Sequence, residues 1–250
     1  MKNQFLLTMI LAMFAIPLIS QEIGISGELR PRYEYRHGFK TLAPVNKDAA
    51  NFVSQRTRLN MDYKSKKFNV FFAIQNVSIW GDVNTLSSSA KNGVAFHQAW
   101  AEYFFNDKFS MKLGRQEISY DDQRIFGTVG WAQQARSHDA FLLKLKTGER
   151  GNLHVGFAIN ANKETLFKED YAINQYKSLQ YAWYNNKFNN GLGLSALFLN
   201  NGMPFTPLDE AQKVTYSQTV GARLTYKKNR ISADAASYFQ TGSTPNGLKN

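Results

Sequence analysis

The sequence has no cysteine among its 250 residues, which excludes a disulfide framework as the source of stability. A sizeable core or a closed hydrogen-bonded sheet must stabilise the fold instead. The mean hydropathy is negative and only 43% of the residues are hydrophobic, which excludes a bundle of membrane helices. The length therefore favours one large domain that is not built from membrane-spanning helices.

Acidic residues are few, with 19 Asp and Glu against 30 Lys and Arg, and the formal net charge is +11. Lys2 is the only charged residue among the first twenty, so the rest of the chain carries +10. Such a basic balance indicates anionic ligands or anionic lipid headgroups as partners. We expect no nucleic acid, because the sequence shows no clustered basic helix and no recognition motif.

Residues 1–20 have the layout of a secretory signal peptide. Lys2 precedes an apolar run over residues 5–19, and a polar segment starts at Gln21. A membrane anchor is the alternative, but the run has about 15 residues and is interrupted by Pro17, whereas a spanning helix needs roughly 20. We therefore predict export and cleavage before Gln21, with residues 21–250 forming one β-barrel domain.

After Gln21 the chain alternates polar and apolar side chains, which is the period of a β-strand. In the first strand the apolar face carries Ile23, Ile25, Leu29, Tyr33 and Tyr35. The opposite face carries Glu22, Ser26, Glu28, Arg30, Arg32, Glu34 and Arg36. Residues 53–63 repeat the pattern, with Arg56 and Arg58 on the polar face. Further strands are predicted at 68–79, 95–105, 109–118, 138–147, 152–161, 176–186, 191–200, 214–226 and 229–240.

Soluble β-sandwiches also alternate, but two features favour a membrane barrel. The polar faces are rich in charges and amides, which suits a water-filled lumen. Aromatic residues stand near strand ends, as in interfacial girdles, at Tyr33, Tyr35, Tyr103, Phe105, Tyr181, Trp183 and Tyr226. We predict an all-β fold, a transmembrane antiparallel up-and-down β-barrel of the bacterial outer membrane.

The connections alternate between short polar turns and long loops, as in bacterial barrels, whose long loops face outside the cell. The long loops are predicted at 37–51, 80–94, 119–137, 162–175 and 201–213. Eleven strands are an odd number, and the last one runs into the loop-like segment 244–247. Single-chain bacterial barrels have even numbers of strands, so we expect the barrel to be incomplete in this chain.

Residues 113–144 resemble the alginate-export porin family. The matching pieces are Gly114-Arg115-Gln116, Arg124 with Gly127, Trp131, and Arg136 followed by Asp139. Weaker similarity runs through 55–59, 75–81 and 98–102, so that residues 22–147 are well covered. The resemblance implies an outer-membrane barrel of roughly 18 strands, whose arginine-lined pore passes a polyuronate chain outward. This sequence is too short to supply that many strands.

Two groups of residues are predicted to line the pore. Arg30, Arg32, Arg56 and Arg58 fall on the polar faces of adjacent strands, where arginine forks can hold carboxylates with two hydrogen bonds. These arginines could equally pair with Glu28, Glu34 and Asp62 to brace the wall. The second group, matched by the resemblance, comprises Glu102, Arg115, Arg124, Arg136, Asp139 and Lys144. Arg124 lies in a predicted loop with Asp121 and Asp122, which either constricts the pore or is pinned to its wall.

No enzyme, cofactor or metal site is expected. The four histidines, His37, His97, His138 and His154, are dispersed, and no catalytic or phosphate-binding motif is found. We predict passive passage of an anionic oligo- or polysaccharide such as alginate through an arginine-lined lumen. The alternatives are a general or small-anion porin and, less favoured, an outer-membrane lipid hydrolase using a lone serine with His97 or His154. The expected partners are outer-membrane lipid, the anionic solute and, for an exporter, periplasmic proteins.

Overall fold

The structure is a computed structural model, and it describes residues 22–86, 93–173 and 175–248. The predicted signal segment lies outside the described residues. Within them, no helix has the length and apolarity needed to cross a membrane. The described residues form eleven strands: β1 (Glu22–Arg36), β2 (Ala50–Lys64), β3 (Phe68–Ile79), β4 (Ala95–Phe104), β5 (Phe109–Gln116), β6 (His138–Thr147), β7 (Gly151–Ile159), β8 (Ser178–Lys187), β9 (Leu192–Phe205), β10 (Lys213–Lys228) and β11 (Ile231–Gly242).

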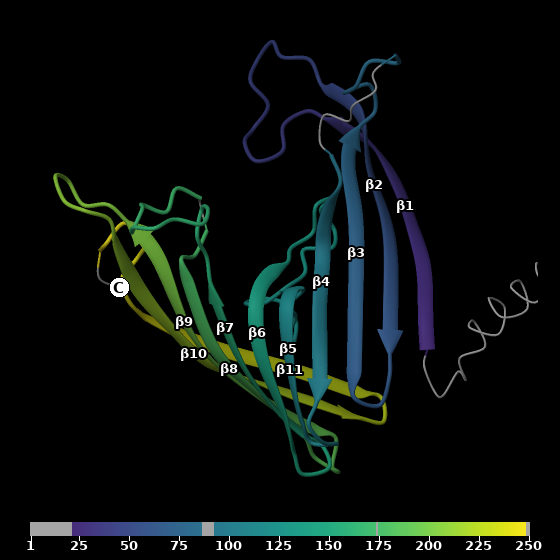
Figure 1. The fold of residues 1–250 in the computed structure, drawn as a ribbon, viewed down its shortest axis with the longest axis vertical. Helices are drawn as coiled ribbons and strands as arrows, with labels where there is room; N and C mark the ends of the chain where they lie inside the picture. Colours follow the sequence, from purple (N-terminus) through teal and green to yellow (C-terminus); the bar gives the residue numbers. More distant parts are fainter. Residues whose placement is uncertain (1–21, 87–92, 174, 249–250) are drawn as a thin grey trace, which may run out of the picture.

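All eleven strands belong to one antiparallel sheet in which each strand pairs with the next along the chain. The sheet is strongly curved and is not closed, with β1 and β11 as its edges (Figure 1). The predicted all-β up-and-down architecture is therefore confirmed, and the open sheet agrees with the expected incomplete barrel. Strands β2, β9 and β10 are longer than predicted, because the pairing of β1 with β2 extends to the pair Arg36 and Ala50, and the pairing of β9 with β10 extends to the pair Phe205 and Lys213.

The outer face of the sheet is apolar and uncovered. Ile23, Ile25 and Leu29 of β1 have 69%, 71% and 68% of their surface exposed, and Phe157, Phe198 and Val220 continue this exposed face on later strands. Alternation explains the pattern, since every second side chain of a strand points to the same side. A contiguous apolar surface of this extent is typical of contact with a membrane or another protein.

Aromatic rings gather on the outer face beside the short turns. Tyr103 lies 5.0 Å from Phe68 and 4.9 Å from Phe105, and Phe105 lies 5.0 Å from Phe109, measured between ring centroids. The predicted aromatic position of Tyr103 and Phe105 at the strand ends is thus found. Tyr181 and Trp183 are a correction, because they lie on the opposite, inner face of β8, where Tyr181 is only 3% exposed.

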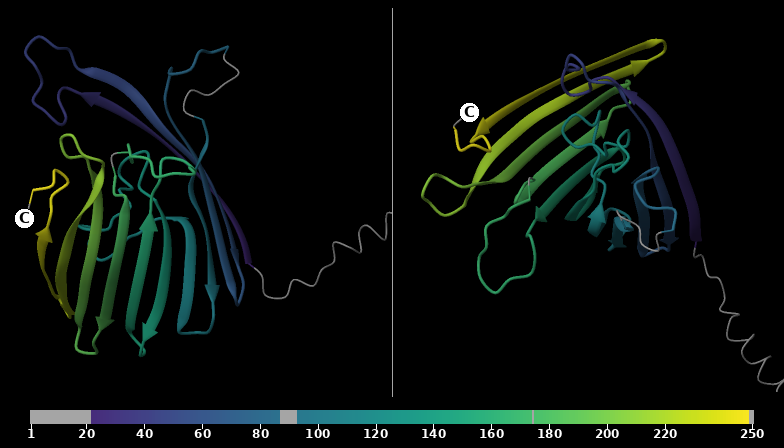
Figure 2. Two further views of the ribbon diagram at one scale, coloured as in Figure 1. Left: turned by 60° about the vertical axis from the view of Figure 1, so that its left-hand side comes forward. Right: turned by 90° about the horizontal axis from the view of Figure 1, so that it is seen from above.

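Short turns join the strands at one rim and longer loops join them at the other (Figure 1). One long connection behaves differently from the rest. Residues 117–137, between β5 and β6, turn back onto the concave side of the sheet and lie between β1–β4 and β8–β11 (Figure 2). We call this segment the inner loop, and it is the feature that brings distant strands into one site.

Candidate functional site

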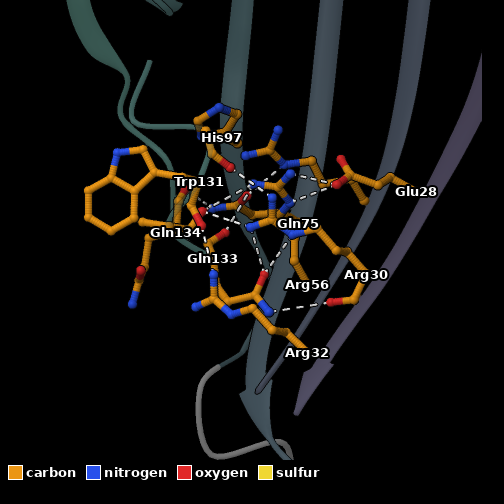
Figure 3. A network of polar contacts seen from close by, with 12 residues as sticks. Glu28, Arg30, Arg32, Arg56, Gln75, His97, Trp131, Gln133 and Gln134 are labelled. Atoms are coloured by element: carbon orange, nitrogen blue, oxygen red, sulfur yellow. Dashed lines mark hydrogen bonds and ion pairs between the residues drawn. The ribbon is translucent and has the colours of Figure 1, made fainter. Parts of the chain in front are cut away.

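The tip of the inner loop is held by arginines through its backbone. Arg30 of β1 donates from Nη1 to the carbonyl oxygen of Gly130 at 2.7 Å and from Nη2 to that of Ala132 at 2.9 Å. Arg32 donates to the carbonyl oxygen of Trp131 at 2.8 Å. The short, charge-assisted geometry makes these bonds strong ones. Figure 3 shows the side chains of β1 and β2 converging on this stretch.

The next two strands complete the contact with the loop. Arg56 of β2 donates to the carbonyl oxygen of Gln133 at 3.3 Å and forms an ion pair with Glu28 at 2.5 Å. Gln75 of β3 donates to the carbonyl oxygen of Gln134 at 3.1 Å and accepts a bond from Arg58 at 2.8 Å. Each carbonyl oxygen from 130 to 134 therefore accepts a bond from β1, β2 or β3.

Gln133 is the one side chain of the loop tip that is inserted into the sheet, and it is only 4% exposed. Its Oε1 accepts bonds from Arg30 Nε at 3.0 Å and Nη2 at 2.8 Å. Its Nε2 donates to the backbone oxygen and the hydroxyl of Ser54, both at 3.0 Å. The sequence did not predict Gln133 and Gln75 as site residues, because nothing in their neighbouring residues distinguishes them from glutamines on a protein surface.

The wall beside the loop tip keeps an excess of positive charge. Glu34 lies between Arg32 and Arg36, at 2.9 and 2.5 Å, and Glu28 pairs with Arg56. Within the described chain no carboxylate is paired with Arg30, and none with Arg58, which also has a buried, unpartnered Nη2. Glu117, the other carboxylate nearby, is bonded to His97 at 2.7 Å.

The base of the inner loop packs on the opposite arm of the sheet through apolar contacts. Ile118 and Phe126 are 3% and 5% exposed and belong to a buried cluster on the inner faces of β6–β9. Tyr120 stacks on Trp183 with ring centroids 4.5 Å apart. Its hydroxyl lies 3.0 Å from His154 Nδ1, and burial raises the pKa of Tyr120 so that it stays protonated.

Asp121 fixes the same part of the loop by polar contacts. It accepts bonds from the indole nitrogen of Trp183 at 3.0 Å and from the hydroxyl of Ser195 at 2.6 Å. Arg124 and Asp122 remain near the surface, 3.7 Å apart, with the Arg124 side chain 65% exposed. The loop is therefore pinned to both arms, and it also occupies the space between them.

The loop backbone is strained where it changes direction. Asp121, Gln123, Val129 and Ala135 all have positive φ angles, at 52°, 63°, 51° and 55°. Such angles disfavour residues other than glycine, and a β-branched residue such as Val129 most of all. Strain of this kind costs about 1–3 kcal/mol per residue and persists only where surrounding contacts impose it. The arginine and Gln133 contacts meet that condition.

The other predicted site residues lie away from the arginines of β1 and β2. Glu102 and Lys144 form an ion pair of 3.0 Å on the inner face, nearer the short turns, and Ser110 donates to Glu102 at 2.7 Å. Arg115 and Asp139 also pair, at 2.8 Å, but the strand register puts them on the face of Leu113 and Phe141. That is the outer face, so this pair does not join the arginines of β1 and β2.

Arg136 ends the loop and is exposed. Its backbone nitrogen donates to the carbonyl oxygen of Thr128 at 2.7 Å, which closes the base of the tip. Gln116, in the motif that carried the resemblance, is fully buried beneath the loop and donates to the carbonyl oxygen of Ala140 at 2.8 Å. Within the motif 114–116, the side chain of Arg115 therefore lies on the outer face of the curved sheet and that of Gln116 on the inner face.

Replacing Gln133 with Leu is expected to loosen the loop tip without unfolding the sheet. The change removes the acceptor of two Arg30 donors and the donor to Ser54, whose hydroxyl keeps its bonds to Arg32 and Glu34, and it costs about 1–3 kcal/mol. Amide hydrogen exchange at Ala132 and Arg136, whose N–H groups donate to the carbonyl oxygens of Val129 and Thr128, should rise roughly tenfold or more, while β1–β3 keep their protection. Gln134→Leu is the matched control, because the Gln134 side chain is exposed and only its backbone is bonded. Equal exchange in both variants would contradict the anchoring role of Gln133.

None of the curated proteins compared with the chain matches it. A family model described as alginate export matches residues 21–154, which is more than half of the 250 residues and includes both β1–β3 and the whole inner loop. The protein belongs to the alginate export family, a family of transport porins.

Proposed function

We propose that the protein gives an anionic oligo- or polysaccharide of the polyuronate class a passive path across the bacterial outer membrane. The exposed apolar face of Ile23, Ile25 and Leu29 then contacts lipid, and the concave face is the wall of the path. Family membership supports a polysaccharide as the substrate. In this arrangement the inner loop narrows the path, and the arginines of β1 and β2 line the narrow part.

The observation that carries the proposal is the unbalanced charge beside the loop tip. Arg30, Arg32, Arg36, Arg56 and Arg58 face it with only Glu28 and Glu34 interspersed. Fixed positive charge in a constriction attracts anions, and the carboxylates keep binding weak enough for release. Arg30, Arg32 and Arg56 also bind carbonyl oxygens of the loop, which satisfy N–H groups without removing the positive charge. Arg32 and Arg56 are in addition paired with Glu34 and Glu28, so among these three it is Arg30 that has no carboxylate partner in the described chain.

Replacing Arg32 and Arg36 with Gln is expected to lower the preference for anions. Both side chains are more than a third exposed and flank Glu34, so the change leaves a local negative charge facing water. The anion-to-cation permeability ratio, measured from reversal potentials in planar bilayers under a salt gradient, should fall severalfold. Lys66→Gln with Lys67→Gln removes the same charge from the short turn between β2 and β3 and should leave the ratio nearly unchanged. A native protein that prefers cations would refute the proposal.

A small-anion porin is the second candidate, and the inner loop is the observation that favours it, because it occupies the concave side of the sheet. The two functions differ in what blocks the current. Oligouronates should block at concentrations at which phosphate and small sugar acids of the same total charge do not. Equal block by all of them would favour the small-anion function.

A further inference from the structure

We infer that Trp131 is a stacking platform for a sugar ring, and that together with Arg32 it forms a subsite for one hexuronate residue of the substrate. The inference rests on the proposed function and adds to it a residue that contacts the substrate and a mode of recognition. The indole takes the C–H face of the pyranose, and the guanidinium takes its carboxylate.

The first observation is that Trp131 is exposed on a rigid backbone. Its relative exposure is 72%, although the carbonyl oxygens of Gly130, Trp131 and Ala132 are all bonded to arginines. Among the described residues, its indole forms no hydrogen bond, ring contact or cation–π contact. Figure 3 shows the indole pointing away from the polar network while its backbone lies within it. A tryptophan held in this way is available to a ligand without a loss of loop entropy on binding.

The second observation concerns the place of Trp131 in the fold. Exposed tryptophans of barrels commonly anchor the outer surface at the lipid interface. Trp131 does not fit that role, because Arg32, which binds its carbonyl oxygen, lies on the inner face of β1. An apolar ring left in water on the concave side instead fits a ligand with an apolar patch of its own, such as the axial C–H groups of a pyranose.

The third observation is the spare binding capacity of Arg32. The guanidinium offers five N–H donors, of which Nε and one on Nη2 face Glu34 and one on Nη1 binds Trp131. Two donors therefore remain, on a side chain that is 39% exposed. A carboxylate can accept both. A uronate satisfies the two halves of the subsite at once, whereas a neutral sugar or a simple carboxylate satisfies only one.

The test measures current block in planar bilayers by an oligouronate of four to six residues, by a neutral oligosaccharide of equal length, and by acetate. Trp131→Ala should weaken block by the oligouronate roughly three- to tenfold, which is the scale of one aromatic contact. Block by the neutral oligosaccharide should also become weaker. Acetate should be unaffected. Trp131→Phe should retain most of the native block. Trp80→Ala is the matched control, because Trp80 is 62% exposed but is bonded to Gln55 on the outer face.

A second readout uses the native protein and the conservative variant Trp131→Phe, and it does not measure current. Oligouronate binding should shift the tryptophan fluorescence of the folded native protein, and the shift should be lost in Trp131→Phe. Unchanged block in Trp131→Ala, or a native protein whose emission does not respond, would overturn the subsite. If anion preference and oligouronate block persist in that case, the proposed function stands and only the role of Trp131 falls. If the native channel shows neither, the proposed function itself fails.

Discussion

Removal of the inner-loop tip is expected to raise single-channel conductance roughly twofold or more, because current follows the narrowest open section of a pore. The variant joins Gly127 to Arg136 through two glycines and so deletes the strained turn and the carbonyls bound by β1–β3. Arg30 and Arg56 then lose their backbone partners and become accessible to ions. We therefore expect anion preference to persist while the current increases and block by oligouronates weakens.

The control for the tip deletion shortens another connection at the same rim. Residues 207–211, between β9 and β10, can be replaced by two glycines without touching the arginines of β1 and β2. Conductance should then stay within the scatter of the native channel. If tip deletion leaves conductance unchanged, the loop does not set the narrowest section, and its contacts serve only to brace the wall.

Gly114→Ala is expected to prevent most of the chain from reaching the folded barrel. Gly114 has a φ of 121°, and an added Cβ would lie 2.3 Å from the carbonyl oxygen of Ala99 and 2.9 Å from Cα of Trp100. Both contacts are with the backbone of the paired strand β4, which cannot move without breaking the ladder. The combined cost of the angle and the overlap is about 2–5 kcal/mol, a large part of the stability of a typical domain.

Gly27→Ala is the matched control for this prediction. Gly27 also lies within a strand, but its added Cβ would meet only the carbonyl oxygen of Arg58 at 3.8 Å, an ordinary contact. Folded fractions after refolding into detergent can be compared by heat-modifiable gel migration, and stabilities by urea titration. The positional requirement at Gly114 would be contradicted if the two variants folded to the same extent.

The sequence predicted the strands well because alternation is a local signal. Every predicted segment overlaps an observed strand, and the faces assigned to β1, β2 and β10 match the exposed residues Ile25, Leu59 and Val220. Alternation fails where both faces carry apolar side chains. Tyr181 was assigned to the outer girdle because it stands near a strand end. The inner face of β8 is also apolar, because the inner loop packs on it, and Tyr181 lies there.

Outer faces also carry polar groups that alternation does not predict. Gln180, Asn200 and Gln218 are aligned on β8, β9 and β10 and bond to one another at 2.7 and 2.8 Å. They share their face with Phe198 and Val220. Mutual hydrogen bonding removes most of the cost of placing amides on an apolar surface. Arg115 of β5 and Asp139 of β6, also on the outer face, likewise satisfy each other, as an ion pair.

The site itself was predicted in part. Both Arg30 and Arg56 were expected on one inner wall, and the register pairs them directly across β1 and β2. Their partners could not be predicted, because Arg30 and Gln133 are 103 residues apart and meet only when a loop folds back. Of the two roles left open for the loop, pinning is what the contacts of Asp121 with Trp183 and Ser195 show, and constriction of a path is the proposal that deletion of the loop tip tests.

The arginines of β1 and β2 hold residues 130–132 by their carbonyl oxygens alone. Every amino acid supplies that oxygen, so the side chains of these residues are free to diverge without releasing the segment from its anchors. Evolution or an engineer can thus exchange Trp131 and its neighbours to suit a different cargo while the scaffold underneath stays the same.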